Sequence, residues 1–270
     1  MMITQKVVVI TGASSGIGKA LAERYAHAGY KLALAARNLE RLQKAAKLLP
    51  TDSLLVACDV SQMDDCQQLI RQTIERFGRI DTLINNAGIS MRALFQDVSL
   101  EVLHQVMDIN FWGTVYCTKF ALPYLQKTQG SIIGISSIAG HRGLPARSGY
   151  SASKFAMNGF LEAIRAELLP DKVHVLTVSP GFTASNIRKV ALNAQGSQQG
   201  ESPRDETNMM SAEAVAEAVF KAQQKRKHSI ILTTQGKLTV FLNKWFSKWM
   251  DKKVLHILAQ EPDTPLKTKE

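Results

Sequence analysis

Hydrophobic residues gather in seven short runs along the chain, and longer amphipathic stretches separate the runs. Runs with few polar residues are typical of strands in a parallel sheet that is covered on both faces. The runs lie at residues 6–10, 31–36, 53–58, 81–84, 130–136, 173–179 and 229–233. The stretches between them predict helices at 16–28, 38–48, 62–77, 99–127, 150–168 and 211–225. This regular alternation predicts an α/β fold, in which a doubly wound, seven-stranded parallel sheet carries helices on both faces.

Two segments do not follow this alternation. Residues 182–210 are long and polar, and a loop of that length in a compact domain is usually functional or disordered. We expect it to be a mobile lid over a substrate site. Residues 236–258 predict one last helix. We therefore divide the chain into a main domain at 1–235 and a basic amphipathic extension with a tail at 236–270.

The net charge of +10 is concentrated in one region of the chain. Residues 221–253 contain nine Lys or Arg and one acidic residue, Asp251, so this segment contributes +8 and the rest of the chain +2. Such charge attracts nucleic acid or an anionic membrane, or it forms an ordinary solvated face. No nucleic-acid-binding motif accompanies it, so nucleic acid is not an expected partner.

The three cysteines indicate an intracellular protein without disulfides. Cys58, Cys66 and Cys117 have no paired spacing, so we expect reduced thiols in a cytoplasmic compartment. The start of the chain shows no signal-peptide pattern, which agrees with this expectation. No metal site is predicted.

A glycine motif follows the first predicted strand and opens the first helix. Gly12, Gly16 and Gly18 allow a tight turn and a close approach of the backbone to a pyrophosphate at the helix N-terminus. Turns need glycine in any case, but this position favours a dinucleotide site of the Rossmann type. The residues expected to contact the cofactor in this motif are Gly12, Ser14, Ser15, Gly16, Ile17 and Gly18.

The second predicted strand indicates which dinucleotide binds. Sites for NAD usually have an acidic residue about 20 residues beyond the glycines, to bind the ribose 2′-hydroxyl. Here the strand ends in Ala36, Arg37 and Asn38, without an acid. Arg37 is suited to a 2′-phosphate, so we predict NADP(H). The alternative is that Arg37 is only the first solvated residue of a helix.

The ends of the third and fourth strands add further candidates at the same edge of the sheet. Asp59 and Val60 stand where the adenine is expected, although Asp59 is equally suited to a turn or a helix cap. Asn86, Ala87 and Gly88 follow the fourth strand at the crevice where ligands bind. We include all five among the cofactor contacts.

Taken together, the motifs resemble the short-chain dehydrogenases/reductases, in their shorter single-domain branch. The resemblance covers the chain to about residue 235 and depends on the order and spacing of six motifs. These are TGASSGIG at 11–18, NNAG at 85–88, Asn110, Ser137, YSASK at 150–154 and SPGF at 179–182.

The resemblance implies a role for each of four catalytic residues. Tyr150 is the general acid in carbonyl reduction or the base in alcohol oxidation, and the charge of Lys154 favours its phenolate. Lys154 also holds the nicotinamide ribose. Ser137 hydrogen-bonds the substrate oxygen as negative charge develops on it, while the adjacent Ser136 is a packing residue. Asn110 holds a water that relays protons to Lys154, although taken alone this asparagine is better explained by a local helix contact.

The segment after the sixth strand is expected beside the nicotinamide. Pro180 and Gly181 shape the turn, and the hydroxyls of Thr183 and Ser185 are candidates for its carboxamide. The substrate pocket is expected between 89–97, 138–148 and the loop after Gly181. Apolar residues such as Met91, Phe95 and Leu144 suit a lipophilic carbonyl or alcohol.

The predicted last helix has an apolar side and a basic side. Its apolar residues are Leu238, Leu242, Trp245, Phe246 and Trp249, and its lysines are Lys237, Lys244, Lys248 and Lys252. Such a helix docks on its own domain, assembles with another subunit, or lies in a membrane interface through 236–255. The resemblance also implies a homodimer or homotetramer formed through the helices near 99–127 and 150–168.

Two functions of different classes remain. The first is an NADP(H)-dependent oxidoreductase that interconverts a carbonyl and a secondary alcohol. The second is a non-catalytic protein that keeps the dinucleotide site and acts as a redox sensor or a membrane-surface scaffold. The complete set of Asn110, Ser137, Tyr150 and Lys154 favours the first.

Overall fold

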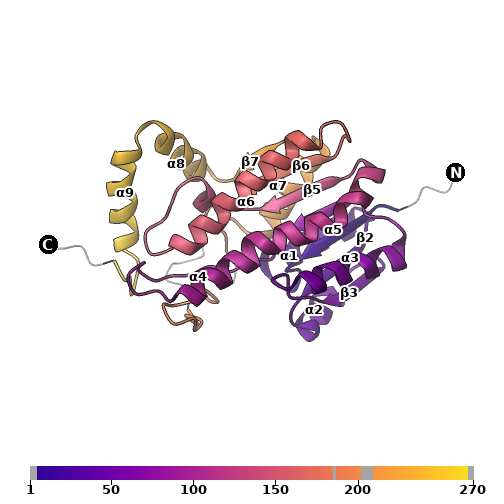
Figure 1. Ribbon diagram of the computed structural model, residues 1–270, viewed down its shortest axis with the longest axis horizontal. Helices are drawn as coiled ribbons and strands as arrows, with labels where there is room; N and C mark the ends of the chain where they lie inside the picture. The colour runs from indigo at the N-terminus through magenta and orange to yellow at the C-terminus, as the bar shows by residue number, and fades with distance from the viewer. Residues whose placement is uncertain (1–4, 185–186, 202–208, 267–270) are drawn as a thin grey trace.

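The predicted parallel sheet is present in the computed structural model, which describes residues 5–184, 187–201 and 209–266. Seven parallel strands lie in the order β3-β2-β1-β4-β5-β6-β7 (Figure 1). The fold class predicted from the sequence is therefore confirmed. The strands are β1 Val7–Thr11, β2 Lys31–Ala36, β3 Ser53–Ala57, β4 Thr82–Asn85, β5 Ser131–Ile135, β6 His174–Ser179 and β7 Ser229–Ile231.

Helices cover both faces of the sheet because consecutive side chains of a strand point to opposite sides. In β1, Val8 and Ile10 belong to the core beneath α1 and α7, whereas Val9 belongs to the core beneath α3, α5 and α6. The helices are α1 Gly16–His27, α2 Leu39–Ala46, α3 Met63–Phe77, α4 Leu100–Met107, α5 Gly113–Thr128, α6 Ser148–Glu167 and α7 Ala212–Gln224.

The helix predicted at 99–127 is interrupted by a wider turn. A π-helical turn at Asp108–Trp112 separates α4 from α5, and Asn110 lies in its middle. Such turns insert one extra residue into a helix and are frequent at functional sites. The hydrophobic pattern over 99–127 predicts one continuous helix and does not show this turn.

The single helix predicted at 236–258 is wrong: two helices, α8 Thr234–Trp245 and α9 Ser247–Ala259, meet at Phe246. The backbone of Phe246 leaves the helical region, with φ −131 and ψ 44. The change of direction lets Met250, Val254 and Leu258 of α9 become buried in a third, small hydrophobic cluster. In Figure 1 the two helices lie at one end of the molecule, away from the N-terminus.

The cysteines are free, as predicted, and all three are buried. A hydrogen bond with Cys66 and burial raise the pKa of the Cys58 thiol well above its ordinary value, and a hydrogen bond with Cys117 together with burial raises the pKa of Cys66. Thiols with raised pKa values react slowly, because the thiolate is the nucleophile. Cys58 and Cys66 are therefore packing residues, and Cys117 is fully buried in the same core.

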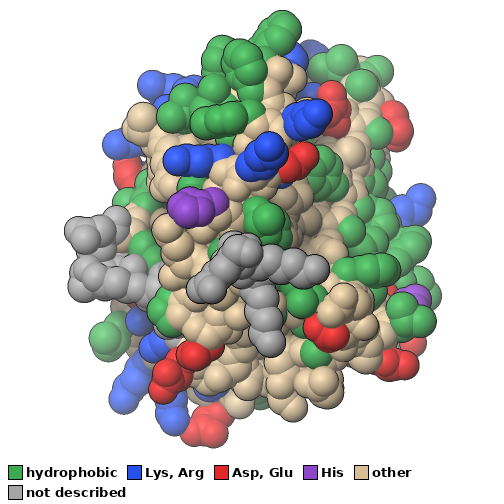
Figure 2. Space-filling model, turned by 90° about the vertical axis from the view of Figure 1, so that its left-hand side faces the viewer, with side chains coloured by type: hydrophobic (Ala, Val, Ile, Leu, Met, Phe, Trp, Pro, Cys, Tyr) green, Lys and Arg blue, Asp and Glu red, His purple; other side chains and the backbone are tan. Residues whose placement is uncertain are grey.

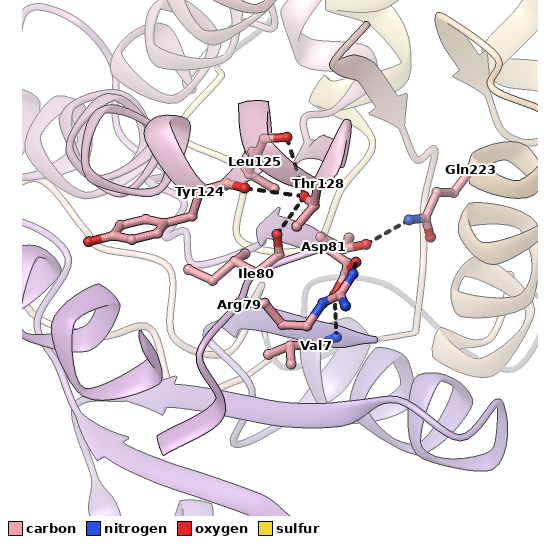
Figure 3. Close-up of polar contacts among 9 residues, drawn as sticks. Val7, Arg79, Ile80, Asp81, Tyr124, Leu125, Thr128 and Gln223 are labelled. Atoms are coloured by element: carbon pink, nitrogen blue, oxygen red, sulfur yellow. Dashed lines mark hydrogen bonds and ion pairs between the residues drawn. The ribbon is translucent and has the colours of Figure 1, made fainter. Parts of the chain in front are cut away.

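A polar cluster fixes the end of the sheet at which β1 and β4 begin (Figure 3). The buried carboxylate of Asp81 accepts a hydrogen bond of 2.8 Å from the backbone N–H of Val7 and pairs with Arg79 at 2.6 Å. Beside it, Thr128 donates to the carbonyl of Ile80 at 2.8 Å, and Gln223 donates to Thr82 at 2.7 Å. These contacts connect α5 and α7 to the strands at the edge opposite the predicted site.

We expect Asp81→Ala to lower the free energy of unfolding by about 1–3 kcal/mol, because it leaves a buried backbone donor without its partner. Urea denaturation measures this change. Asp52→Ala is the matched control: it removes an exposed ion pair with Arg76 at 3.1 Å and should change the free energy by less than about 1 kcal/mol. Equal losses in the two variants would contradict a role of Asp81 in holding β1 to β4.

Candidate active site

The glycine turn after β1 is packed so closely against the end of β4 that side chains do not fit. Gly12 has a left-handed φ of 66°, and a Cβ atom there would lie 2.9 Å from the Cα of Ala87. A Cβ on Gly18 would lie 2.1 Å from the carbonyl oxygen of Gly12. These glycines are therefore required by the turn itself, which brings the start of α1 to the centre of the sheet edge.

Thr11 and Asn86 hold the turn to β4, and the sequence analysis did not single out Thr11. The Thr11 hydroxyl accepts from the backbone N–H groups of Asn86 at 3.0 Å and Ala87 at 3.1 Å. The Asn86 amide donates to the carbonyls of Thr11 at 2.9 Å and Gly12 at 3.2 Å. The side-chain amide of Asn86 thus binds the backbone of the glycine turn. The signal that could have identified Thr11 is a hydroxyl at the last position of a buried strand.

The start of α1 fits an anionic group such as a diphosphate. Its first turn contains no acidic residue, and its first N–H groups have no intrahelical partner. The side-chain hydroxyls of the half-buried Ser14 and Ser15 make no hydrogen bond to any residue that the structure describes. Ile17 is partly buried against the core under α1, and its part in binding the cofactor stays a prediction.

Arg37 stands exposed at the end of β2, next to the start of α2. Its guanidinium forms no ion pair with the residues described, while its neighbour Asn38 caps α2 by accepting from Arg41 N–H at 2.8 Å. No carboxylate occupies the end of β2. The position therefore fits a phosphate better than a ribose diol.

Asp59 and Val60 make their contacts within the protein itself. The Asp59 carboxylate accepts from the backbone and the hydroxyl of Ser61 at 3.0 and 2.8 Å, which is the turn role considered from the sequence. Val60 is buried, and a Cβ on Gly113 would lie 2.8 Å from its side chain. Their part in binding adenine stays a prediction.

Tyr150 and Ser137 come together where α6 begins beside the end of β5. Burial raises the pKa of the Tyr150 phenol, and a hydrogen bond with Ser137 together with the charges of Arg147 and Arg188 opposes that rise. Ser137 begins a short 3-10 turn at Ile138–Gly140, whereas Ser136 is buried. The phenol is therefore held in its protonated form beside a second hydroxyl.

Lys154 lies one helical turn beyond Tyr150, and its side chain is almost fully buried. Its Nζ lies 5.9 Å from the centre of the Tyr150 ring and donates to the carbonyl of Ile135 at 2.9 Å. Burial lowers the pKa of its ammonium to about 8. An ammonium has three donors, and its second contact, to the weakly accepting Met157 sulfur, is long at 3.9 Å, so Lys154 keeps donors for a ligand besides the bond to Ile135.

Asn110 joins the π-helical turn to the segment after β4. Its Oδ1 accepts from the N–H of Ile89 at 2.8 Å, and its Nδ2 donates to the carbonyl of Ile89 and to Ser153, both at 2.9 Å. Both amide hydrogens are therefore in use on residues far away in the chain, and neither makes the local helix contact considered from the sequence. A Cβ on Gly88 would lie 3.1 Å from Asn110 Oδ1 and 3.5 Å from Lys154 Nζ. The water relay through Asn110 stays a prediction.

The segment after β6 passes beside these residues. The Pro180 carbonyl accepts from Ile138 N–H at 3.1 Å, and a Cβ on Gly181 would lie 2.6 Å from the Thr233 hydroxyl. Thr183 is buried and donates to the Gly181 carbonyl at 3.3 Å. Ser185, the other hydroxyl expected at the carboxamide, lies outside the described residues.

The described part of the loop predicted as a lid packs on the segment after β4. Leu192 is buried, donates to the Ser90 carbonyl at 2.9 Å and accepts from Arg92 N–H at 2.8 Å. The apolar residues expected to wall a pocket have different surroundings: Met91 is fully buried, whereas Phe95 is 73% exposed. The motion of residues 182–210 stays a prediction.

Buried charges connect the C-terminal extension to the site, and the sequence analysis missed them. Glu261 is buried and pairs with Arg147 at 2.8 Å and with Arg92 at 3.5 Å. Arg147 directly precedes α6, three residues before Tyr150. No group of three or more His, Cys, Asp or Glu residues in the described ranges is arranged to hold a metal ion.

Similar proteins of known sequence carry dehydrogenase names. A family model described as short chain dehydrogenase matches residues 6–196. The chain is 44% identical over 190 residues to 11-beta-hydroxysteroid dehydrogenase-like 2 of Arabidopsis thaliana, which covers 68% of this chain and 61% of that protein. It is 37% identical over 235 residues to dehydrogenase/reductase SDR family member 7B of Mus musculus, covering 84% and 73%. The chain thus matches only about three-fifths of the plant relative.

Solved structures agree with this grouping. An alcohol dehydrogenase from the archaeon Thermococcus sibiricus, complexed with 5-hydroxy-NADP, is 28% identical with a TM-score of 0.74, covering 84% of this chain and 96% of that one. A metagenomic short-chain oxidoreductase in complex with NADP is 25% identical with a TM-score of 0.71, covering 85% and 97%. The family model spans most of the chain and the glycine turn and the Tyr150 helix lie at one sheet edge, so this chain belongs to the short-chain dehydrogenase/reductase family.

Proposed function

We propose that the protein is an NADP(H)-dependent oxidoreductase that interconverts a carbonyl and a secondary alcohol on a lipophilic small molecule. The observation that carries the proposal is the grouping of Tyr150, Ser137 and Lys154 at the sheet edge that also carries the Gly12 turn. A binding protein needs the glycine turn, but it does not need a protonated phenol beside a hydroxyl and a buried ammonium.

Tyr150 moves the proton in this proposal. A bound nicotinamide cofactor supplies or accepts the hydride at the carbon atom. In reduction, the Tyr150 hydroxyl donates its proton to the substrate oxygen, which becomes the alcohol. Ser137 donates a hydrogen bond to the same oxygen while negative charge develops on it. The raised pKa of Tyr150 keeps the phenol protonated before the reaction, which suits a general acid.

Lys154 supplies a positive charge and hydrogen-bond donors near the phenol of Tyr150. Its ammonium favours the phenolate that forms when Tyr150 gives up its proton. The bond from its Nζ to the Ile135 carbonyl fixes the side chain, and the remaining donors are available to a ribose diol. The pKa of about 8 leaves the ammonium mostly charged near neutral pH.

Preference for NADP(H) rests on Arg37. The side chain is exposed at the end of β2, where NAD enzymes usually have a carboxylate, and two of the similar structures contain NADP or 5-hydroxy-NADP. The proposal of a lipophilic substrate draws on the names of the plant relatives, which are 11-beta-hydroxysteroid dehydrogenase or 11-beta-hydroxysteroid dehydrogenase-like. Pairing through α5 and α6 stays a prediction of the family resemblance.

We expect Tyr150→Phe to abolish turnover while NADPH still binds with nearly wild-type affinity, because only the phenolic hydroxyl is removed. Activity is measured with NADPH over a panel of ketosteroids, acyl ketones, retinoids, sugars and quinones, and binding by the fluorescence of NADPH. The half-buried Tyr124 of α5 provides the control Tyr124→Phe, which should keep its turnover. A wild-type protein that binds NADPH but is inactive on the whole panel would favour the redox sensor.

We expect Arg37→Ala to weaken NADPH binding by about 10–150-fold, the range for a lost hydrogen-bonded charge pair. NADH binding should change by less than about threefold, because NADH lacks the 2′-phosphate that Arg37 would contact. Titration of both dinucleotides into the variant measures the ratio. Arg41→Ala, which removes an exposed arginine one turn further along α2, is the control. An equal loss for NADPH and NADH would refute the phosphate contact.

Replacement of Lys154 should change how stability depends on pH. Below about pH 8 the ammonium is charged in both folded and unfolded chains, so the full penalty of its burial is present. As pH rises from about 8 towards the unfolded value of 10.5, the folded chain releases the proton first and the penalty declines. Relative to wild type, Lys154→Met should therefore lose about 1–3 kcal/mol of stability over this interval.

Denaturation of the cofactor-free proteins between about pH 7 and 10 measures this slope. Lys47→Met is the control, because Lys47 is exposed at the end of α2. The pH dependence of its free energy of unfolding should run parallel to that of wild type. A constant difference between Lys154→Met and wild type would contradict the lowered pKa of Lys154.

A further inference from the structure

The junction of α8 and α9 carries large hydrophobic side chains on the surface. Exposed fractions reach 66% for Trp245, 59% for Phe241 and 53% for Trp249. We define the apolar surface by the five exposed residues at this junction: Leu238, Phe241, Trp245, Phe246 and Trp249. The packing of α9 on the main domain leaves these five residues exposed, because it buries the other face of α9, which carries Met250, Val254 and Leu258.

Lysines surround the apolar surface, and acids are scarce. Helices α8 and α9 carry five exposed lysines, which are Lys237, Lys244, Lys248, Lys252 and Lys253. None of them pairs with a carboxylate among the residues that the structure describes. The single acid of the two helices, Asp251, pairs with Arg142 of the main domain. Figure 2, which faces the end with α8 and α9, shows hydrophobic side chains at the top with basic side chains beside them.

The apolar surface is held rigidly to the body of the protein. Asn243 donates to the His141 carbonyl at 3.0 Å and accepts from Arg142 at 3.0 Å. A Cβ on Gly236 would lie 2.8 Å from Ile138, so the start of α8 is in close contact with the main domain. The pair of Arg147 with the buried Glu261 anchors the chain after α9. The exposed aromatic residues are therefore presented by fixed helices and not by a frayed end.

We propose that this surface docks on an anionic lipid bilayer. Phe and Trp side chains enter the boundary between head groups and acyl chains, while lysines reach the lipid phosphates with their long side chains. The contact is peripheral, since no helix in the described part of the chain is long and apolar enough to span a membrane. This inference does not depend on the proposed activity.

Charge favours the bilayer over a second copy of the chain. A two-fold contact through this surface would bring the five lysines of each copy together, and Asp251 is already used by Arg142. An anionic bilayer instead offers a phosphate to each lysine, and each such contact strengthens binding. The expected pairing helices α5 and α6 are different elements from α8 and α9.

Co-sedimentation of the full chain with vesicles tests the proposal. We expect wild type to sediment with phosphatidylcholine vesicles that contain phosphatidylserine, and to stay mainly in the supernatant with phosphatidylcholine alone. Binding should weaken as salt is raised, because the lysine contacts are screened. Emission of the tryptophans should shift to shorter wavelength on binding, because Trp245 and Trp249 leave water.

Two variants separate the contributions. Trp245→Ala with Trp249→Ala, and separately Lys244→Glu with Lys248→Glu and Lys252→Glu, should each reduce binding by at least about tenfold. Lys6→Glu with Lys47→Glu and Lys127→Glu changes the net charge equally at exposed positions elsewhere and should keep binding. Circular dichroism verifies that every variant is folded.

Three outcomes would overturn the proposal. The first is wild type that stays in the supernatant with both kinds of vesicle. The second is equal loss of binding in both lysine variants, which would indicate attraction by overall charge only. The third is a wild-type oligomer, measured by light scattering, that ignores vesicles and dissociates in the tryptophan variant; the surface would then be an interface between copies.

Discussion

The backbone of the Gly12 turn and the end of β4 lie almost in contact, and the rest of the site is arranged around this approach. A Cβ on Gly12 would lie 2.9 Å from the Cα of Ala87, so a side chain there would push β1 and α1 away from β4. Thr11 and Asn86 close the approach with four hydrogen bonds between the two segments. The start of α1, with its unpaired N–H groups, is thereby directed at the point where the order of the strands reverses.

The part of the site around Asn110 and Lys154 is likewise held by close backbone packing and by hydrogen bonds. The π-helical turn points Asn110 at the backbone of Ile89, and this contact positions the segment that continues from Gly88. A Cβ on Gly88 would lie 3.1 Å from Asn110 Oδ1, so this glycine leaves room for the amide, and Lys154 Nζ packs at an ordinary 3.5 Å from the same point. A polar residue in a buried helix is tolerated here because each of its donors has a partner. The buried amide and the buried ammonium are thus consequences of one close packing.

The C-terminal extension is more closely joined to the main domain than a division at residue 235 suggests. Glu261 is buried between Arg92 and Arg147, and removal of one member of such a cluster leaves a buried charge without its partner. Arg147 in turn opposes the rise in the pKa of Tyr150. The extension is therefore connected to the phenol through a chain of charges, while its outer face carries exposed aromatic residues and lysines.

The sheet, the layers of helices and the glycine turn could be predicted from the sequence, because they depend on local periodicity and on turn chemistry. The spacing of one helical turn placed Tyr150 beside Lys154, and the family resemblance selected Ser137. Four features became visible only in the folded chain: the π-helical turn at Asn110, the break between α8 and α9 at Phe246, the hydrogen bonds of Thr11 to the end of β4, and the burial of Glu261. Each of these features depends on a contact with a residue far away in the chain. The partners are, in the same order, Ile89, Leu144, Asn86 and Arg147. The periodicity of a single segment carries no information about such contacts.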